Sequence, residues 1–139
     1  MDKKLNKNIL AVRLYTGEQV IPCLEKAMKS TGKPLGIVMS GAGMMKEVKL
    51  GYFIGKGKYK ENAFMSPREI VSLSGNFVNT EKKVYTHLHV SLADDEGRVT
   101  GGHLKEALVH GTGEIFLYVS NMKLTRKKEK ETSLEGLKL

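Results

Sequence analysis

Short apolar stretches recur along this chain, some continuous and some alternating with polar residues, and each of them predicts a β-strand. The predicted strands comprise residues 9–15, 35–39, 48–54, 68–76, 84–92 and 113–119. Only one stretch has helical spacing, with an apolar stripe made of Val20, Ile21, Leu24, Ala27 and Met28 and an end at Gly32. Many strands with one principal helix indicate an α+β fold with a mostly antiparallel sheet.

Two glycine-containing segments lie at the expected ends of these elements. Thr16-Gly17-Glu18-Gln19 has the spacing of a capping box, which predicts a helix that opens there. Pro22 lies too deep for the first turn of that helix, so the helix either begins later than Thr16 or bends. Ser40-Gly41-Ala42-Gly43 predicts a tight turn. It lacks the third glycine and the Lys-Ser/Thr ending of phosphate-binding loops, and we interpret it as backbone geometry.

The strand predicted at residues 84–92 carries two histidines. Its residues alternate strictly, so the apolar positions point towards the core and His87 and His89 share the opposite face. The segment Asp94-Asp95-Glu96-Gly97 that follows predicts a turn. The strand therefore continues into a hairpin whose second arm contains His103.

The length of the hairpin loop decides where His103 points. A three-residue loop with Gly97 in the left-handed conformation pairs Asp94 with Arg98. Counting back along both strands then places His103 opposite His89, with Cβ atoms ~4.5–5.5 Å apart. A four-residue loop would send His103 to the other face of the sheet.

Three imidazoles at one point of a sheet predict a metal site on His87, His89 and His103. Neutral imidazole is a good ligand for zinc and other late first-row metals, and three protein ligands with an open position are typical of catalytic zinc. Structural zinc sites usually have four protein ligands, whereas this chain has a single cysteine, Cys23, in the predicted helix. Zinc is the expected metal, with manganese, iron, cobalt or nickel as alternatives. Polar histidines on a solvated strand face are the alternative interpretation, and His110 has no comparable geometric argument.

The composition describes one domain over residues 1–139. With 40% hydrophobic and 27% charged residues, the chain has enough apolar residues for a core and is not of the disordered class. No stretch approaches the ~20 apolar residues of a membrane span. The N-terminus lacks the apolar core of a signal peptide, so we expect a cytoplasmic protein without a membrane partner.

The chain is basic, with a net charge of +8 that is concentrated at its ends. Residues 1–8 form a basic lead-in, and residues 121–139 form a basic tail. The tail is the one candidate for disorder, although Leu134, Leu137 and Leu139 could pack it back onto the domain. Such charge suits DNA or another polyanion, but no helix-turn-helix and no aromatic-basic stripe accompanies it. A solvated basic surface is an equally good interpretation.

Several short motifs follow one another in the order in which they occur in a known family. They are Arg13 with Thr16-Gly17-Glu18, Ser40-Gly41-Ala42-Gly43 with Leu50-Gly51-Tyr52-Phe53, Glu69-Ile70-Val71-Ser72-Leu73-Ser74-Gly75-Asn76, His87-Leu88-His89-Val90-Ser91-Leu92, Gly97-Arg98-Val99, Gly101-Gly102-His103-Leu104 and Leu134-Glu135-Gly136-Leu137-Lys138-Leu139. Over roughly residues 9 to 139 the chain thereby resembles the plants-and-prokaryotes-conserved (PPC) domain, in its stand-alone prokaryotic form.

The resemblance implies an α/β domain that assembles as a homotrimer and binds zinc on His87, His89 and His103. Plant members lack these histidines, so the family does not need the metal in order to fold. The fold implied is similar to that of acetolactate decarboxylase, which also holds zinc on a His-x-His and a later histidine. Stand-alone prokaryotic members are commonly described as DNA-binding. This chain has no Arg-Gly-Arg core of an AT-hook, which argues against direct minor-groove binding.

Three functions are consistent with these features. The first is a zinc-binding, DNA-associated regulatory module that acts as a homotrimer. The second is a zinc-dependent lyase or hydrolase of a small carbonyl or carboxylate substrate, since an open zinc polarises carbonyls and lowers the pKa of bound water towards ~7. We expect Glu69 to carry the proton in that case, with Glu114 as the alternative, and Arg13 or Arg68 to hold an anionic ligand. Glu69 is equally well explained as a structural partner. The third function is that zinc only ties neighbouring elements together.

Overall fold

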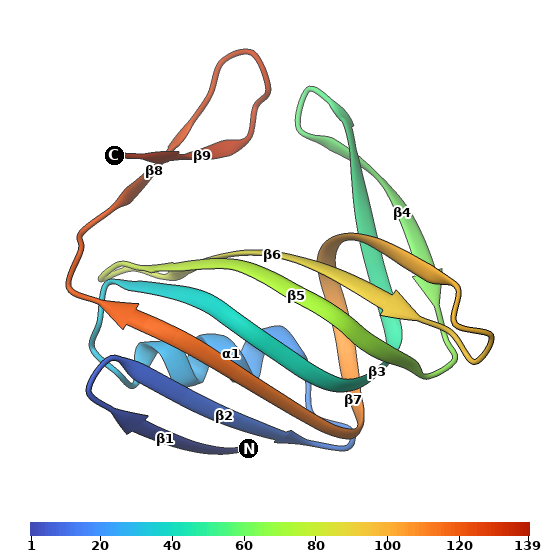
Figure 1. The fold of residues 1–139 in the computed structure, drawn as a ribbon. Coiled ribbons are helices and arrows are strands. Elements are labelled where there is room, and N and C mark those ends of the chain that lie inside the picture. The colour runs from blue at the N-terminus through green and yellow to red at the C-terminus, as the bar shows by residue number, and fades with distance from the viewer.

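The structure is a computed structural model that describes all residues from 1 to 139. Its elements are, in order, β1 (Asp2–Asn6), β2 (Ile9–Tyr15), α1 (Val20–Lys29), β3 (Leu35–Gly55), β4 (Lys58–Phe64), β5 (Arg68–Asn79), β6 (Val84–Ala93), β7 (Val99–Ser120), β8 (Thr125–Lys128) and β9 (Glu135–Lys138). Seven strands form one antiparallel sheet in the order β1-β2-β7-β6-β5-β3-β4 (Figure 1). Because β3 also pairs with β7, the sheet curves back on itself. A mostly antiparallel sheet with one helix, as predicted, is confirmed.

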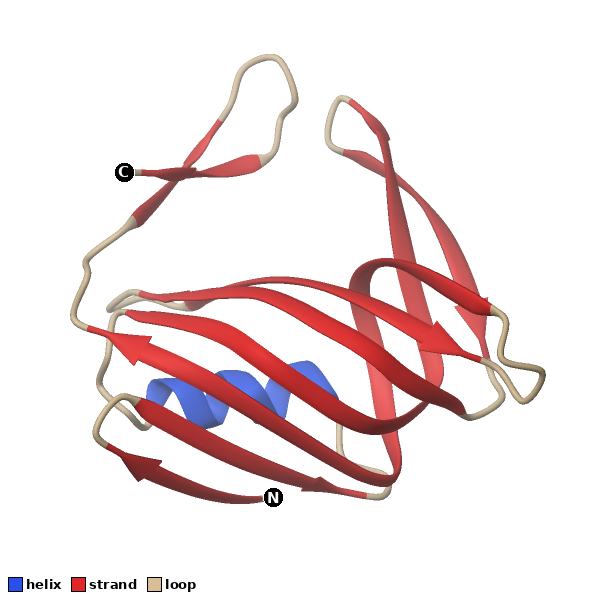
Figure 2. Cartoon of the chain, in the orientation of Figure 1, coloured by secondary structure: helices blue, strands red, loops and turns tan.

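The helix covers one face of this sheet and completes the core (Figure 2). Leu24 and Met28 of α1 are fully buried in one cluster with Phe77 of β5 and Leu88 of β6. Gly36 of β3 makes room for the helix, because a Cβ atom there would lie 2.6 Å from the sulfur of Met28. Full burial of an apolar side chain of this size contributes roughly 1.5–3 kcal/mol. This packing fixes which face of the sheet is buried and leaves the opposite face for the histidines.

The helix begins later than Thr16, which confirms one of the two alternatives predicted for its start, whereas the predicted capping box is wrong. The helix begins at Val20, and Gln19 precedes it without any side-chain cap. Thr16 is not a cap, because its hydroxyl donates to the carbonyl of Gly111 instead. Pro22 is therefore the third helical residue, where a missing N–H costs nothing because the first turn has no acceptor for it. No helix of the protein is long and apolar enough to cross a membrane.

The predicted turn at residues 40–43 is wrong, because this segment runs through the middle of the long strand β3. Two β-bulges accommodate its glycines, between Val38 and Ser40 and between Gly43 and Met44. A Cβ atom at Gly43 would lie 2.0 Å from the carbonyl oxygen of Thr112 on β7. The glycines thus allow β3 and β7 to approach each other closely while they bend, rather than reversing the chain.

Two hairpins project from the face of the sheet that α1 leaves open (Figure 1). The β3–β4 hairpin includes β4, a strand that the sequence pattern did not predict. The β8–β9 hairpin is formed by the basic tail, which packs back onto the domain through Arg126 and Leu134. The tips of the hairpins meet, because a Cβ atom at Gly57 would lie 3.2 Å from that of Ser133. We call these hairpins the two arms.

Candidate metal centre

The hairpin β6–β7 places the histidines as predicted. Leu88 and Val90 are buried, whereas His87 and His89 lie on the open face between the arms. The loop has three residues: the N–H of Asp94 donates to the carbonyl of Arg98 at 3.0 Å, and Gly97 has a φ of +75°. His103 is in consequence the register partner of His89.

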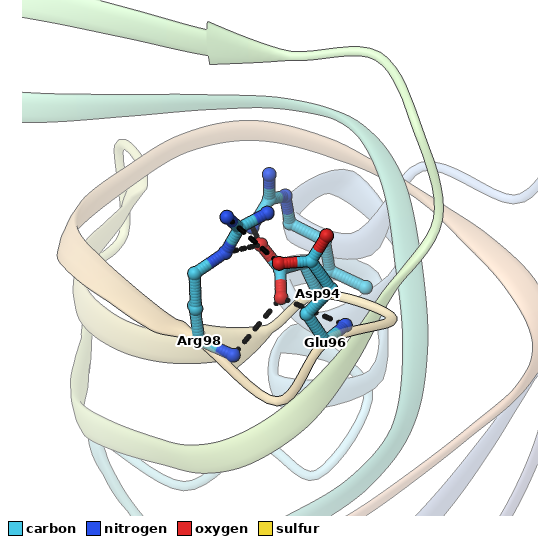
Figure 3. A network of polar contacts seen from close by, with 4 residues as sticks. Asp94, Glu96 and Arg98 are labelled. Carbon is cyan, nitrogen blue, oxygen red and sulfur yellow. Dashed lines mark hydrogen bonds and ion pairs between the residues drawn. The ribbon is translucent and has the colours of Figure 1, made fainter.

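Asp94 holds this loop in its conformation (Figure 3). One carboxylate oxygen accepts hydrogen bonds from the backbone N–H groups of Glu96 and Arg98, and the other accepts one from Nε of Arg98 at 3.0 Å. Desolvation would raise the pKa of Asp94, but the hydrogen bonds from Arg98 and Glu96 outweigh it and hold the pKa below its usual value. The charged carboxylate therefore fixes the register on which the histidine cluster depends.

The three imidazoles converge on one point. Their candidate ligand atoms all lie within 4.8 Å of one another, and the Nε2 atoms of His87 and His89 are 3.1 Å apart. The ring centroids are separated by 5.1–5.5 Å. Nδ1 of His103 is buried and has no hydrogen-bond partner. Three imidazoles that each offer a ring nitrogen at one point form a set of ligands that suits a metal cation. The unpartnered Nδ1 of His103 is also consistent with a missing partner at this site.

The surroundings keep two of these imidazoles uncharged. Desolvation, with Lys105 and the other two histidines, lowers the pKa of His103 from 6.5 to about 4. Desolvation, with His89 and Arg126, also lowers the pKa of His87. Both rings are therefore neutral at pH 7, which is the protonation state that metal ligation requires.

The histidines open into a cavity of about 180 Å³ between the sheet and the arms. Its walls are formed by Tyr85, Thr86, His87 and His103 of the sheet, Tyr59 of the β3–β4 arm, and Arg126, Leu134 and Glu135 of the β8–β9 arm. The ring of Tyr59 lies 5.4 Å from that of His103, and Nζ of Lys105 lies 3.8 Å above the Tyr59 ring. Gly51 makes this possible, because a Cβ atom there would lie 2.9 Å from Tyr59.

The structure places the other candidate residues away from this cavity. Glu69 is the register partner of Ala93, which is four residues beyond His89 on β6, or ~13 Å along the strand. Glu114 is paired with Arg13 in the other half of the sheet. Arg68 stacks on the ring of Phe64 and lies 3.8 Å from Asp94. The catalytic role expected for Glu69 stays a prediction.

Sequence reasoning missed Tyr59 and Arg126 as residues of the site. Tyr59 lies on β4. The glycine- and lysine-rich segment before and at the start of this strand does not show the apolar pattern that would predict a strand. Arg126 belongs to the tail and reaches the cavity only because the β8–β9 arm folds back. The one available signal was the set of leucines in the tail, of which Leu134 does line the cavity.

Comparison with known proteins gives a consistent picture. Residues 1–121 match the model of the Plants and Prokaryotes Conserved (PCC) domain, the PPC domain named above. The fold is similar to a PPC protein of Pyrococcus horikoshii, with a TM-score of 0.81 and 31% identity over 99% of this chain and 97% of that one. It is similar to a metal-containing protein of Archaeoglobus fulgidus, with a TM-score of 0.81 and 29% identity over 96% and 94%. A proposed DNA-binding protein of Bacteroides thetaiotaomicron gives a TM-score of 0.91 and 25% identity over 99% and 96%.

A curated relative in sequence is a larger protein. The bifunctional protein GlmU of a Synechococcus strain is 31% identical over 111 residues, or 78% of this chain. The match spans 17% of the length of that relative, and a GlmU of a second Synechococcus strain gives a similar match over 16%. The likeness therefore concerns one part of those proteins.

Proposed function

The chain belongs to the Plants and Prokaryotes Conserved domain family, and from this premise we propose that it is a zinc-binding homotrimer that associates with DNA. The main support for a bound metal ion is that one ligand atom from each of three imidazoles lies within 4.8 Å of the others. The metal-containing relative from Archaeoglobus fulgidus supports it. His87, His89 and His103 would hold the ion. Zinc on three imidazoles supplies Lewis-acid chemistry when it is bound.

The homotrimer is supported by an apolar row on the open face of the sheet. Register pairs connect Ile9, Tyr118 and Ile37 across β2, β7 and β3, and the same row continues through Asn76 to His87. The apolar members of the row, together with Phe116, expose 37–44% of their surface. A contiguous apolar surface of this kind is typical of a protein interface. A second copy of the chain is the partner that the family relationship favours.

Association with DNA is supported by the charge of the two arms. Lys56, Lys58 and Lys60 of the β3–β4 arm and Lys127, Lys128 and Lys130 of the β8–β9 arm are all exposed. The tips of the arms meet at Gly57 and Ser133, and we call the six lysines of these neighbouring arms the basic crest. Lysines on a surface without base-reading elements bind the phosphate backbone, so the expected binding is independent of sequence and sensitive to salt.

The cavity favours a second candidate function, a zinc-dependent enzyme. His87 and His103 line a partly open cavity beside Tyr59 and Arg126. In this function the hydroxyl of Tyr59 and the guanidinium of Arg126 hold polar groups of a small carbonyl or carboxylate substrate. Glu69 does not line the cavity, so in this structure it is not placed to transfer a proton to a substrate bound there.

The first experiment determines the metal content of the purified, tag-free protein and of a double His87→Ala, His89→Ala variant. We expect about one zinc per chain in the first sample and none in the second. Metal absent from both samples after zinc is supplied would overturn the metal centre. Sedimentation equilibrium on the same samples tests the homotrimer, and a monomer would refute it.

The second experiment measures duplex DNA binding against salt concentration. A double Lys127→Met, Lys128→Met variant should reduce the slope of log K against log salt by up to ~1.8, because each phosphate contact contributes ~0.9. A matched Lys26→Met, Lys29→Met variant changes two exposed lysines on the helix and should leave the slope unaltered. Equal slopes for both variants would refute a role for the basic crest.

A further inference from the structure

The β8–β9 arm brings one cation to the histidine cavity without an acidic partner. Arg126 donates from Nη2 to the side-chain oxygen of Asn76 at 2.7 Å and from Nη1 to the backbone carbonyl of Glu135 at 2.9 Å. Both acceptors are neutral. Nε of Arg126 is buried and has no hydrogen-bond partner. Two of its five N–H groups are therefore engaged, and its charge is not balanced by any ion pair.

The one acidic residue that lines the cavity, Glu135, pairs with a different cation. The side chain of Glu135 forms an ion pair with Lys83 at 3.7 Å, and half of its surface is exposed. The remaining walls are Tyr59, Tyr85, Thr86, the two histidines and Leu134, none of which is acidic. Arg126 therefore forms no ion pair with any residue of the cavity, and a divalent ion on the histidines would add further positive charge. A half-buried guanidinium without a counter-charge is costly unless an anion joins it.

We propose that the cavity binds a small carboxylate anion, which lies between the three histidines and the guanidinium of Arg126. This inference rests on the proposed zinc centre. The planar fork of arginine matches a carboxylate, and Nη1 and Nη2 each have a second N–H that the two hydrogen bonds of the fold do not use. A volume of about 180 Å³ corresponds to about six water molecules, which limits the ligand to a few carbon atoms.

The position of Arg126 in the chain adds a consequence for specificity. It lies beyond residues 1–121, the part that matches the family model. The domain therefore supplies the histidines, and the tail supplies the group that selects the ligand. In this proposal the β8–β9 arm is a specificity-determining element, and Arg126 is its binding residue.

The test uses full-length protein loaded with Co²⁺, whose visible spectrum reports ligands that reach the metal. The probes are malonate, as the small carboxylate, and imidazole, as a neutral ligand that needs no cation. We expect Arg126→Met to weaken malonate binding by ~10-fold or more, because a charge-assisted hydrogen bond is lost. Imidazole binding should stay within about 2-fold. Lys138→Met, which removes an exposed cation on β9 of the same arm, should change neither titration.

A purely structural role for Arg126 predicts a different pattern. Asn76→Ala removes the hydrogen bond that ties the arm to β5 while it keeps the guanidinium. If Arg126 only holds the arm in place, Arg126→Met and Asn76→Ala will lower the melting temperature by similar amounts and leave malonate binding unchanged. That result would overturn the inference. Malonate that fails to bind although imidazole does would also overturn it. A protein that takes up no metal would instead refute the underlying zinc centre.

Discussion

Gly75 lies next to the metal centre and offers a sharp test of how the histidine strand is held. It has a φ of +136° and is the register partner of Leu88, between His87 and His89. A Cβ atom at this position would lie 2.0 Å from the carbonyl oxygen of His87 and 2.9 Å from Cα of Leu88. Both contacts are with backbone, so no side chain can rotate away. Gly75→Ala must therefore separate β5 from β6 at the site.

The expected cost has two parts. The backbone conformation is almost restricted to glycine and costs a larger residue about 1–3 kcal/mol. Relief of the overlap by a backbone shift adds about 1–3 kcal/mol. The sum is about 4 kcal/mol, a large fraction of the 5–15 kcal/mol that stabilises a typical domain. With an unfolding entropy of about 2.1 cal/mol/K per residue over 139 residues, the melting temperature should fall by about 14 °C.

The matched control is Gly97→Ala in the hairpin loop. Gly97 also has a positive φ, of +75°, but a Cβ atom there meets nothing within 4 Å. Only the conformational cost of about 1 kcal/mol applies, or about 3–4 °C. Thermal unfolding followed by circular dichroism, at one protein concentration and with a chelator present, measures both variants. Melting temperatures within about 3 °C of each other would refute the close approach of β5 and β6.

Three further results are expected. Saturating zinc at about 100 times its dissociation constant should stabilise the protein by about 2.7 kcal/mol in denaturant unfolding, and His89→Ala should abolish this gain; a gain that survives would contradict the site. In the metal-free protein, desolvation lowers the pKa values of His103 and His87, so the unfolded state takes up protons first. The free energy of unfolding should be constant above about pH 7 and fall from about pH 6.5 towards pH 4, and His103→Gln should reduce that fall in a urea series; an identical pH profile would speak against it. Asp94→Ala should lower the free energy of unfolding in the same assay, and Asp94→Asn, which keeps an acceptor for the loop N–H groups, should lower it less; equal losses would exclude those hydrogen bonds as the cause.

The histidine hairpin could be predicted because its geometry is local. Asp94 and His103 are nine positions apart in the sequence, and the three-residue loop determines which residues oppose each other. Alternation then decides the face, since Leu88 and Val90 are apolar and buried. The prediction uses no residue outside 84–103. The convergence of three imidazoles therefore follows from short-range rules alone.

The walls of the site depend on contacts that are distant in sequence, and short-range rules do not reach them. Arg126 reaches Asn76 across fifty residues, and Tyr59 covers His103 because Gly51 leaves space on a neighbouring strand. The same limit explains the error at Gly43, where a glycine that suggested a turn instead admits the backbone of β7. A glycine without a side chain is compatible with a reversal of the chain and with the close approach of another strand, and only the partner strand distinguishes them. The cluster that would hold the metal is therefore encoded locally, whereas the groups that would select its ligand are set by the tertiary fold.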